Sequence, residues 1–225
     1  MRSIGSLSGR AIWPFATEEV YPQQGVSIQH MIGIIAEHYN FVLNPDPAAQ
    51  ESVIEFRRGF LSANEHILPV TLIQVYTNGF LVEANDTEIA DFILSDLIQL
   101  LREAIQLREP ARDQGRKYVS QVAVEFEYSI DDLLKSTRGM LGLLTQTFVE
   151  AGYVSEPIGV YKYEFRVDTT QVPPASIQPS FIIERRDQTP FSENRYYSMA
   201  PLPVSDHVEL LRKIEKLAAP TRKSS

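Results

Sequence analysis

Hydrophobic and polar residues alternate in several stretches of the chain, which is the pattern of strands with one buried face. Within residues 118–128, Val122 and Val124 fall on one face, whereas Glu125 and Glu127 fall on the other. A period of two places successive side chains on opposite sides of a sheet. This pattern and a β-branched, aromatic composition predict strands over residues 53–61, 70–76, 80–82, 118–128, 158–168 and 181–186.

Other stretches repeat their apolar residues every three or four positions, which is typical of helices that bury one side. The clearest example runs through Ile89, Ile93 and Leu97, directly after Asp86 and Thr87. Asp and Thr side chains commonly cap the first turn of a helix. Helices are therefore predicted for residues 28–39, 88–107, 130–148 and 208–217.

A tight turn joins two of the predicted strands at Asn78-Gly79. A type I′ turn needs positive φ at both central residues, which Asn tolerates and Gly adopts freely. Residues 70–82 are therefore expected to form a β-hairpin.

The charges on the predicted strands decide the fold class. Strands of a doubly wound parallel sheet are covered on both faces and read as unbroken apolar runs, whereas three strands here carry charges on one face. We expect an α+β fold: a mixed, largely antiparallel sheet of about six strands, with helices packed mainly on one face. The elements show no convincing repeat at a fixed period. One domain is expected over 27–218, with a flexible or strand-like N-terminal arm (1–26) and a flexible C-terminal tail (219–225).

Composition narrows the classes of function. The chain has 225 residues, a net charge of −8 and no cysteine. The acidic balance disfavours general binding to nucleic-acid phosphates, which requires surplus Lys and Arg. The absence of cysteine excludes disulfides, thiol nucleophiles and Cys-ligated metals. No apolar run approaches the ~20 residues of a membrane helix, so we expect no membrane insertion. We expect a soluble, cytoplasmic protein.

Motifs that carry chemistry are missing. The four histidines, His30, His38, His66 and His207, have no spacing that brings three zinc ligands together. There is no Gly-x-Ser-x-Gly elbow, no phosphate-binding loop and no Gly-x-Gly-x-x-Gly fingerprint. We therefore expect no metal, no cofactor and no catalytic residue of these types.

The densest polar segment covers residues 184–197 and supplies the candidate binding site. Arginines there could hold a carboxylate or phosphate with paired hydrogen bonds, and tyrosines could stack on a ligand. The alternative is that the arginines pair with neighbouring acids, so that the segment is a self-paired structural loop. The candidate residues are Arg185, Arg186, Glu193, Asn194, Arg195, Tyr196 and Tyr197.

The favoured hypothesis is a non-enzymatic interaction or assembly protein that acts through protein–protein contacts, with a protein partner or with itself. It rests on the missing catalytic motifs, the amphipathic strands and two proline-rich segments, 172–174 and 199–203, that could lie along a partner.

Two alternatives stay open. One is a hydrolase or transferase with an Arg/Glu-lined groove near 184–197. The other is a nucleic-acid or nucleotide binder that uses a local cluster of Arg57, Arg58, Arg185, Arg186 and Arg195. Substrate, partner, oligomeric state and pathway are not encoded in any motif.

Overall fold

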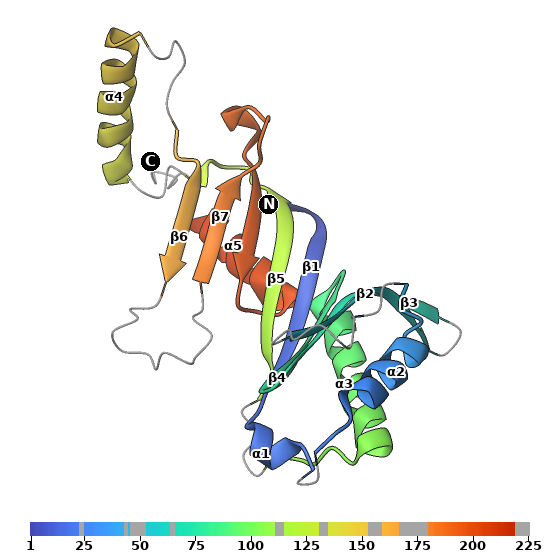
Figure 1. Cartoon of the computed structure of the whole chain (residues 1–225). Coiled ribbons are helices and arrows are strands. Elements are labelled where there is room, and N and C mark those ends of the chain that lie inside the picture. Colours follow the sequence, from blue (N-terminus) through green and yellow to red (C-terminus); the bar gives the residue numbers. More distant parts are fainter. Residues whose placement is uncertain are drawn as a thin grey trace. The chain divides into compact units, whose positions relative to one another are not determined.

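The computed structural model of the chain describes residues 1–22, 25–42, 45, 53–63, 66–110, 115–130, 135–152, 159–166 and 180–218. The strands are β1 (Arg2–Pro14), β2 (Val53–Ala63), β3 (His66–Tyr76), β4 (Gly79–Ala84), β5 (Lys117–Glu125), β6 (Lys162–Arg166), β7 (Ser180–Arg185) and β8 (Arg195–Ala200). The helices are α1 (Thr17–Val20), α2 (Ile28–His38), α3 (Thr87–Ile105), α4 (Lys135–Glu150) and α5 (Val204–Ala218). Figure 1 shows these elements along the chain.

The expected α+β class is confirmed, but the expected size of the sheet is wrong. In the described part of the chain the sheet has eight strands, in the order β2-β3-β4-β1-β5-β8-β7-β6. The pairs β1–β4, β2–β3, β3–β4, β6–β7 and β7–β8 are antiparallel. The two strands that the periodicity did not predict are β1 and β8.

The chain divides into two compact units, each described here by itself. Unit 1 comprises residues 1–5, 121–201 and 205–225, and unit 2 comprises residues 6–120 and 202–204. Part of the expected N-terminal arm is ordered structure, because Gly9 to Pro14 of β1 pair with β4 and α1 follows. The single domain over 27–218 stays a prediction. The C-terminal tail (219–225) and the proline-rich residues 172–174 lie outside the described residues.

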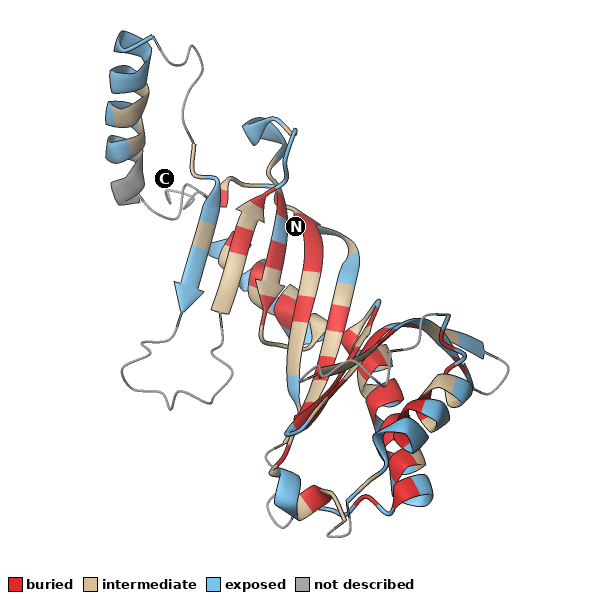
Figure 2. Cartoon of the chain, viewed as in Figure 1, coloured by how far each residue is buried: buried red, intermediate tan, exposed pale blue. Residues whose placement is uncertain are grey.

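Unit 2 buries one side of α2 and α3. Asp86 caps α3 by accepting the Glu88 N–H at 2.8 Å, and Ile93 and Leu97 of that helix are fully buried. Figure 1 shows α2 beside α3, and the buried positions of both helices are visible in Figure 2. The predicted helix over 88–107 and the Asn78-Gly79 hairpin are thus both present in this unit.

One glycine fixes how closely β1 passes the start of α3. A Cβ atom at Gly9 would lie 2.2 Å from the backbone nitrogen of Thr87, far inside van der Waals contact. The Thr87 side chain is buried, and its Oγ1 accepts the backbone N–H of Val204 at 2.9 Å. Only a residue without a side chain fits at this point of β1.

Unit 1 carries α5 against β7 and β8. Ser198 of β8 contacts His207 of α5, and the rings of Phe181 and His207 lie 6.0 Å apart. Leu211, in the middle of α5, is fully buried. By contrast, α4 has no described residue in the buried class, as Figure 2 shows.

The two units repeat one order of elements. Unit 2 runs β1-α2-β2-β3-β4-α3, and its strands lie side by side as β2-β3-β4-β1. Unit 1 runs β5-α4-β6-β7-β8-α5, and its strands lie as β6-β7-β8-β5. The short helix α1 is the one described addition in unit 2. The sequence analysis found no convincing repeat at a fixed period, but the topology does repeat: the described elements form two strand–helix–three-strand–helix modules.

Candidate functional site

The candidate residues of the 184–197 segment lie at the β7–β8 connection of unit 1. Arg185 is only 4% exposed, and its Nε donates to the Val160 carbonyl at 2.9 Å. Its Nη1 donates to the Phe191 carbonyl at 3.1 Å, and its guanidinium carbon lies 4.4 Å from the Phe191 ring centre and 4.9 Å from that of Tyr196. The buried Arg185 side chain thus links the β7–β8 connection to the residues that precede β6. This is a structural role.

Arg195 is also paired within the molecule. It lies 3.1 Å from Glu125 of β5 and 3.1 Å from Glu193. Asn194 takes a left-handed backbone conformation with φ of 48°, and its carbonyl accepts the Phe126 N–H at 3.0 Å. Arg195 thus pairs with two carboxylates of the same chain, which is the kind of contact that the self-paired alternative describes.

The remaining candidates, Arg186, Tyr196 and Tyr197, differ in exposure. The Arg186 guanidinium lies 6.0 Å from the ring centre of Tyr197, and both residues are exposed, whereas Tyr196 is buried at 1%. Of the seven residues, Arg185 and Tyr196 are therefore buried and Asn194 and Arg195 are half-buried. The exposed ones are Arg186, Glu193 and Tyr197. Ligand binding by this segment stays a prediction.

Tyr161, which the sequence analysis did not select, lies at the same connection. Its hydroxyl donates to Asp187 at 2.6 Å and approaches Glu184 at 3.3 Å. The hydrogen bond to the Asp187 carboxylate is the main reason why the pKa of Tyr161 rises to about 12. The acids of this segment are thus partly engaged by a tyrosine hydroxyl.

Unit 2 contains a cavity of about 450 Å³ beside α3. Arg102 and Arg116 contribute cationic groups to it, and Arg102 lies 3.0 Å from Glu109. The lining residues are Trp13, Ser95, Ile98, Gln99, Arg102, Glu109, Pro110 and Arg116.

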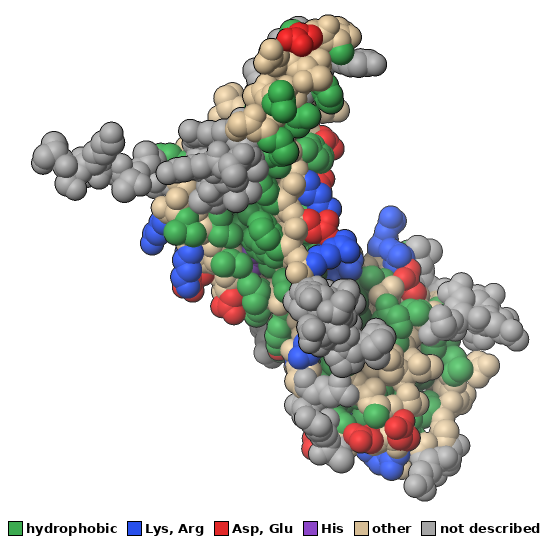
Figure 3. All heavy atoms as spheres, turned by 90° about the vertical axis from the view of Figure 1, so that its left-hand side faces the viewer, with side chains coloured by type: hydrophobic (Ala, Val, Ile, Leu, Met, Phe, Trp, Pro, Cys, Tyr) green, Lys and Arg blue, Asp and Glu red, His purple; other side chains and the backbone are tan. Residues whose placement is uncertain are grey.

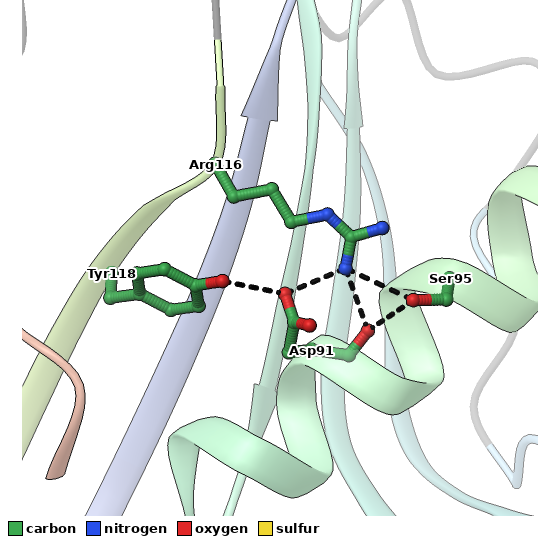
Figure 4. A network of polar contacts seen from close by, with 4 residues as sticks. All are labelled: Asp91, Ser95, Arg116 and Tyr118. Carbon is green, nitrogen blue, oxygen red and sulfur yellow. Dashed lines mark hydrogen bonds and ion pairs between the residues drawn. The ribbon is translucent and has the colours of Figure 1, made fainter. Parts of the chain in front are cut away.

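Arg116 is held at the wall of this cavity by a network that Figure 4 shows. Its Nη1 donates to the Asp91 carboxylate at 2.6 Å, to the Asp91 carbonyl at 3.0 Å and to the Ser95 hydroxyl at 3.0 Å. The Tyr118 hydroxyl donates to the same Asp91 carboxylate at 3.0 Å. Burial and, next, this hydrogen bond raise the pKa of Tyr118.

The same network leaves Ser95 without an activating base among its described contacts. Its hydroxyl donates to the Asp91 carbonyl at 2.8 Å and accepts from Arg116. A nucleophilic serine needs a base that takes its proton, and a carbonyl oxygen is not one. The network therefore fixes β5 against α3 and shows no nucleophile.

A second polar pair, Ser198 and His207, lies in the interior of unit 1. Ser198 Oγ donates to the Ile182 carbonyl at 2.7 Å and lies 2.9 Å from His207 Nε2. Because the single hydroxyl proton goes to the carbonyl, Nε2 of the neutral ring carries the donated proton. This arrangement is the reverse of a catalytic Ser–His pair, in which the histidine accepts the serine proton.

A third polar group joins α2 to α3. His38 Nε2 lies 2.7 Å from the Asp96 carboxylate, and the buried Tyr39 donates to the same carboxylate at 2.8 Å. Burial is the first cause that raises the pKa of Tyr39. Among the residues that the structure describes, no group of three or more potential ligands gathers around a metal position.

An apolar groove lies in unit 1, here called the unit 1 groove, with a cavity volume of about 140 Å³. All of its lining side chains are hydrophobic: Ile130, Tyr163, Phe165, Phe181, Ile183, Ile214 and Leu217. Phe165 is 54% exposed and Leu217 76% exposed. Figure 3 looks onto the β6 side and shows hydrophobic side chains gathered over this part of the unit.

Comparisons with known proteins assign no family, because no protein-family model matches the chain and no significant match was found among curated proteins. Among the described residues, none of the helices combines the length and the hydropathy needed to cross a bilayer.

Proposed function

We propose that the protein works without catalysis, by binding another protein at the unit 1 groove. The single observation that carries this proposal is the exposed apolar lining of the groove, with Phe165 and Leu217 about half or more exposed. Contiguous exposed apolar surface is a common property of protein-binding sites. Full burial of one such side chain contributes about 1.5–3 kcal/mol. Covering two of them therefore contributes at most about 3–6 kcal/mol, and micromolar affinity, about 8 kcal/mol, requires further contacts with the rest of the groove.

The partner segment that fits is an amphipathic helix. In unit 2 the place that corresponds to this groove, beside α3, is occupied by α2, which buries Met31, Ile32 and Ile35. A helix that presents apolar residues at i, i+3, i+4 and i+7 makes the same kind of contact in many grooves.

The alternative functions have less support. Arg185 and Arg195, which a substrate site or a nucleic-acid site would use, are engaged by carbonyls, rings or carboxylates. Arg57 lies in unit 2, where it pairs with Glu55.

Two expectations accompany the proposal: that helices cover mainly one face of the sheet, and that the protein acts in the cytoplasm.

A photo-crosslinking experiment tests the proposal. The photoreactive residue benzoylphenylalanine replaces Phe165 in the groove or, as a matched control, Phe60, a 39% exposed phenylalanine of β2. In cells that naturally make the protein, we expect irradiation to attach one defined protein to position 165 and not to position 60.

The captured protein is then purified and titrated against the unsubstituted chain and against Leu217→Asp. A loss of affinity of at least tenfold supports the proposal. Equal crosslinking at both positions, no crosslinking at position 165, or equal affinity of the two chains overturns it.

A further inference from the structure

Helix α4 is the counterpart of α2 in the repeated order of elements, and the two helices share a sequence pattern. Met31-Ile32-Gly33-Ile34-Ile35 of α2 matches Met140-Leu141-Gly142-Leu143-Leu144 of α4 without a gap. In the same alignment Ser27 corresponds to Ser136, and Tyr39 to Phe148. Three of these positions are identical and the others exchange similar apolar residues. The repeat seen in the topology is therefore also visible in the sequence.

The matched residues differ in burial. In α2, Met31 is 4% exposed and Ile35 is fully buried, and Tyr39 just beyond the helix is fully buried as well. Their counterparts Met140 and Phe148 in α4 are 53% and 41% exposed. Figure 2 shows the contrast between the two helices. Helix α4 therefore carries the same apolar stripe as α2, but in α4 this stripe is exposed.

The unit 1 groove corresponds to the surface of unit 2 that α2 covers. Counted from the first residue of each helix, Leu97 and Leu100 of α3 correspond to Ile214 and Leu217 of α5. Leu97 is fully buried and Leu100 is partly buried against the core of unit 2. Ile214 and Leu217 instead line the groove, and Leu217 is 76% exposed.

The chain connects α4 to this groove at both ends. Ile130 lines the groove, and only residues 131–134 separate it from Lys135, a reach of at most about 18 Å for five steps along the chain. After α4, β6 begins at Lys162, and its Tyr163 lines the groove. Such short connections keep the helix at an effective concentration of the order of millimolar.

We propose that α4 of the same chain docks in the unit 1 groove, as α2 docks beside α3 in unit 2. Met140, Leu144 and Phe148 cover Ile214, Leu217 and the β6–β7 aromatic residues in this docked state. The docking itself does not depend on the proposed function. One consequence rests on it: a partner helix reaches the groove only when α4 leaves, so α4 acts as an internal competitor.

The contacts between α2 and α3 supply the position for a crosslink. His38 lies 2.7 Å from Asp96, and these two residues correspond to Thr147 of α4 and Lys213 of α5. Both counterparts are exposed, so their substitution leaves the core intact. The chain contains no cysteine, so an introduced pair reports on this contact alone.

The test compares two double variants of the full chain. Thr147→Cys with Lys213→Cys places the thiols at the proposed contact. Gln146→Cys with Lys213→Cys is the matched control, because Gln146 corresponds to the exposed Glu37 of α2. Each protein is treated with oxidised glutathione at several protein concentrations, and disulfide formation is followed on non-reducing gels and by mass spectrometry.

We expect the first variant to form an intramolecular disulfide at least tenfold faster than the control, at a rate independent of protein concentration. Equal rates in the two variants overturn the proposal. A disulfide that forms only between two chains also overturns it, because the occupant is then α4 of a second copy.

A second measurement needs no disulfide. Single variants Leu144→Cys and Gln146→Cys are compared by their rates of reaction with a maleimide. Docking predicts at least tenfold protection of position 144, whereas equal rates contradict docking. Both measurements are independent of any partner, so their failure is distinguishable from failure of the proposed function.

Discussion

Ser198 and His207 form a buried hydrogen bond in which the histidine is the donor. The distance from Oγ to Nε2 is 2.9 Å, and the serine gives its own proton to the Ile182 carbonyl. The pair therefore links three segments of unit 1, since β7, β8 and α5 each contribute one partner. Burial of the ring, and not this hydrogen bond, is what favours the neutral form of His207.

Lowering the pH is expected to destabilise the protein through His207. Burial lowers the pKa of His207 from 6.5 to about 4, so between these values the unfolded chain binds the proton more readily. The contribution of neutral His207 to the free energy of unfolding is fully present above pH 6.5. It falls as the pH drops toward 4, and about 2 kcal/mol is lost at pH 5. Urea unfolding at pH 7 and pH 5 measures the difference. A His207→Gln variant should lose this part of the pH dependence, and an identical pH profile would contradict the assignment.

Removing the Ser198 hydroxyl is expected to reduce the free energy of unfolding by about 1–3 kcal/mol. Ser198→Ala takes away the acceptor of His207 and the donor of the Ile182 carbonyl, both in the interior. The control is Ser205→Ala, which alters an exposed serine of α5 and should change stability by less than about 0.5 kcal/mol. Equal unfolding midpoints for the two variants would show that the buried pair contributes nothing.

The Asp91 network predicts a spectroscopic change. Asp91→Asn removes the carboxylate that accepts from Arg116 and Tyr118, so the pKa of Tyr118 should fall toward 10 while burial keeps it above that value. NMR titration of labelled tyrosine measures the pKa directly. We also expect a loss of about 1–3 kcal/mol in stability, because Arg116 loses a charge-assisted hydrogen bond. An unchanged pKa of Tyr118 would rule out this contact in solution.

Two glycine substitutions should act in opposite directions. Gly9→Ala places a methyl group 2.2 Å from the backbone of Thr87 and should cost several kcal/mol, or prevent folding. Gly33→Ala in α2 meets nothing within 4 Å and should raise stability by about 0.5–1 kcal/mol, since alanine favours the helix. Thermal unfolding of both variants is the measurement. Similar melting temperatures would argue against the close approach of β1 to α3.

Sequence patterns predicted the elements that bury one face and missed those whose burial is decided by neighbouring segments. The helix through Ile93 and Leu97 and the Asn78-Gly79 hairpin were both recognisable, because their signals are local. For strand β1 the sequence left a flexible or a strand-like arm open, since its serine and glycine residues give weak alternation and its position is set by pairing with β4.

None of the seven candidate residues chosen from the sequence lines the unit 1 groove, and ligand binding by them stays a prediction. Arg185 carries a charge, so its sequence context indicated a surface role, yet its guanidinium is covered by Phe191 and Tyr196. No local pattern reports such a contact between side chains. The apolar groove was equally hidden, because Phe165 and Leu217 fit ordinary core stripes of a strand and a helix.

The two edge strands of the sheet, β2 and β6, are counterparts in the repeated order of elements. Each carries ionic side chains at alternate positions: Glu55 and Arg57 on β2, and Lys162, Glu164 and Arg166 on β6. Charges on an outermost strand discourage a foreign strand from extending the ladder. The outermost strands of the sheet are therefore protected against edge-to-edge aggregation, although Phe165 and Leu217 of the unit 1 groove are exposed.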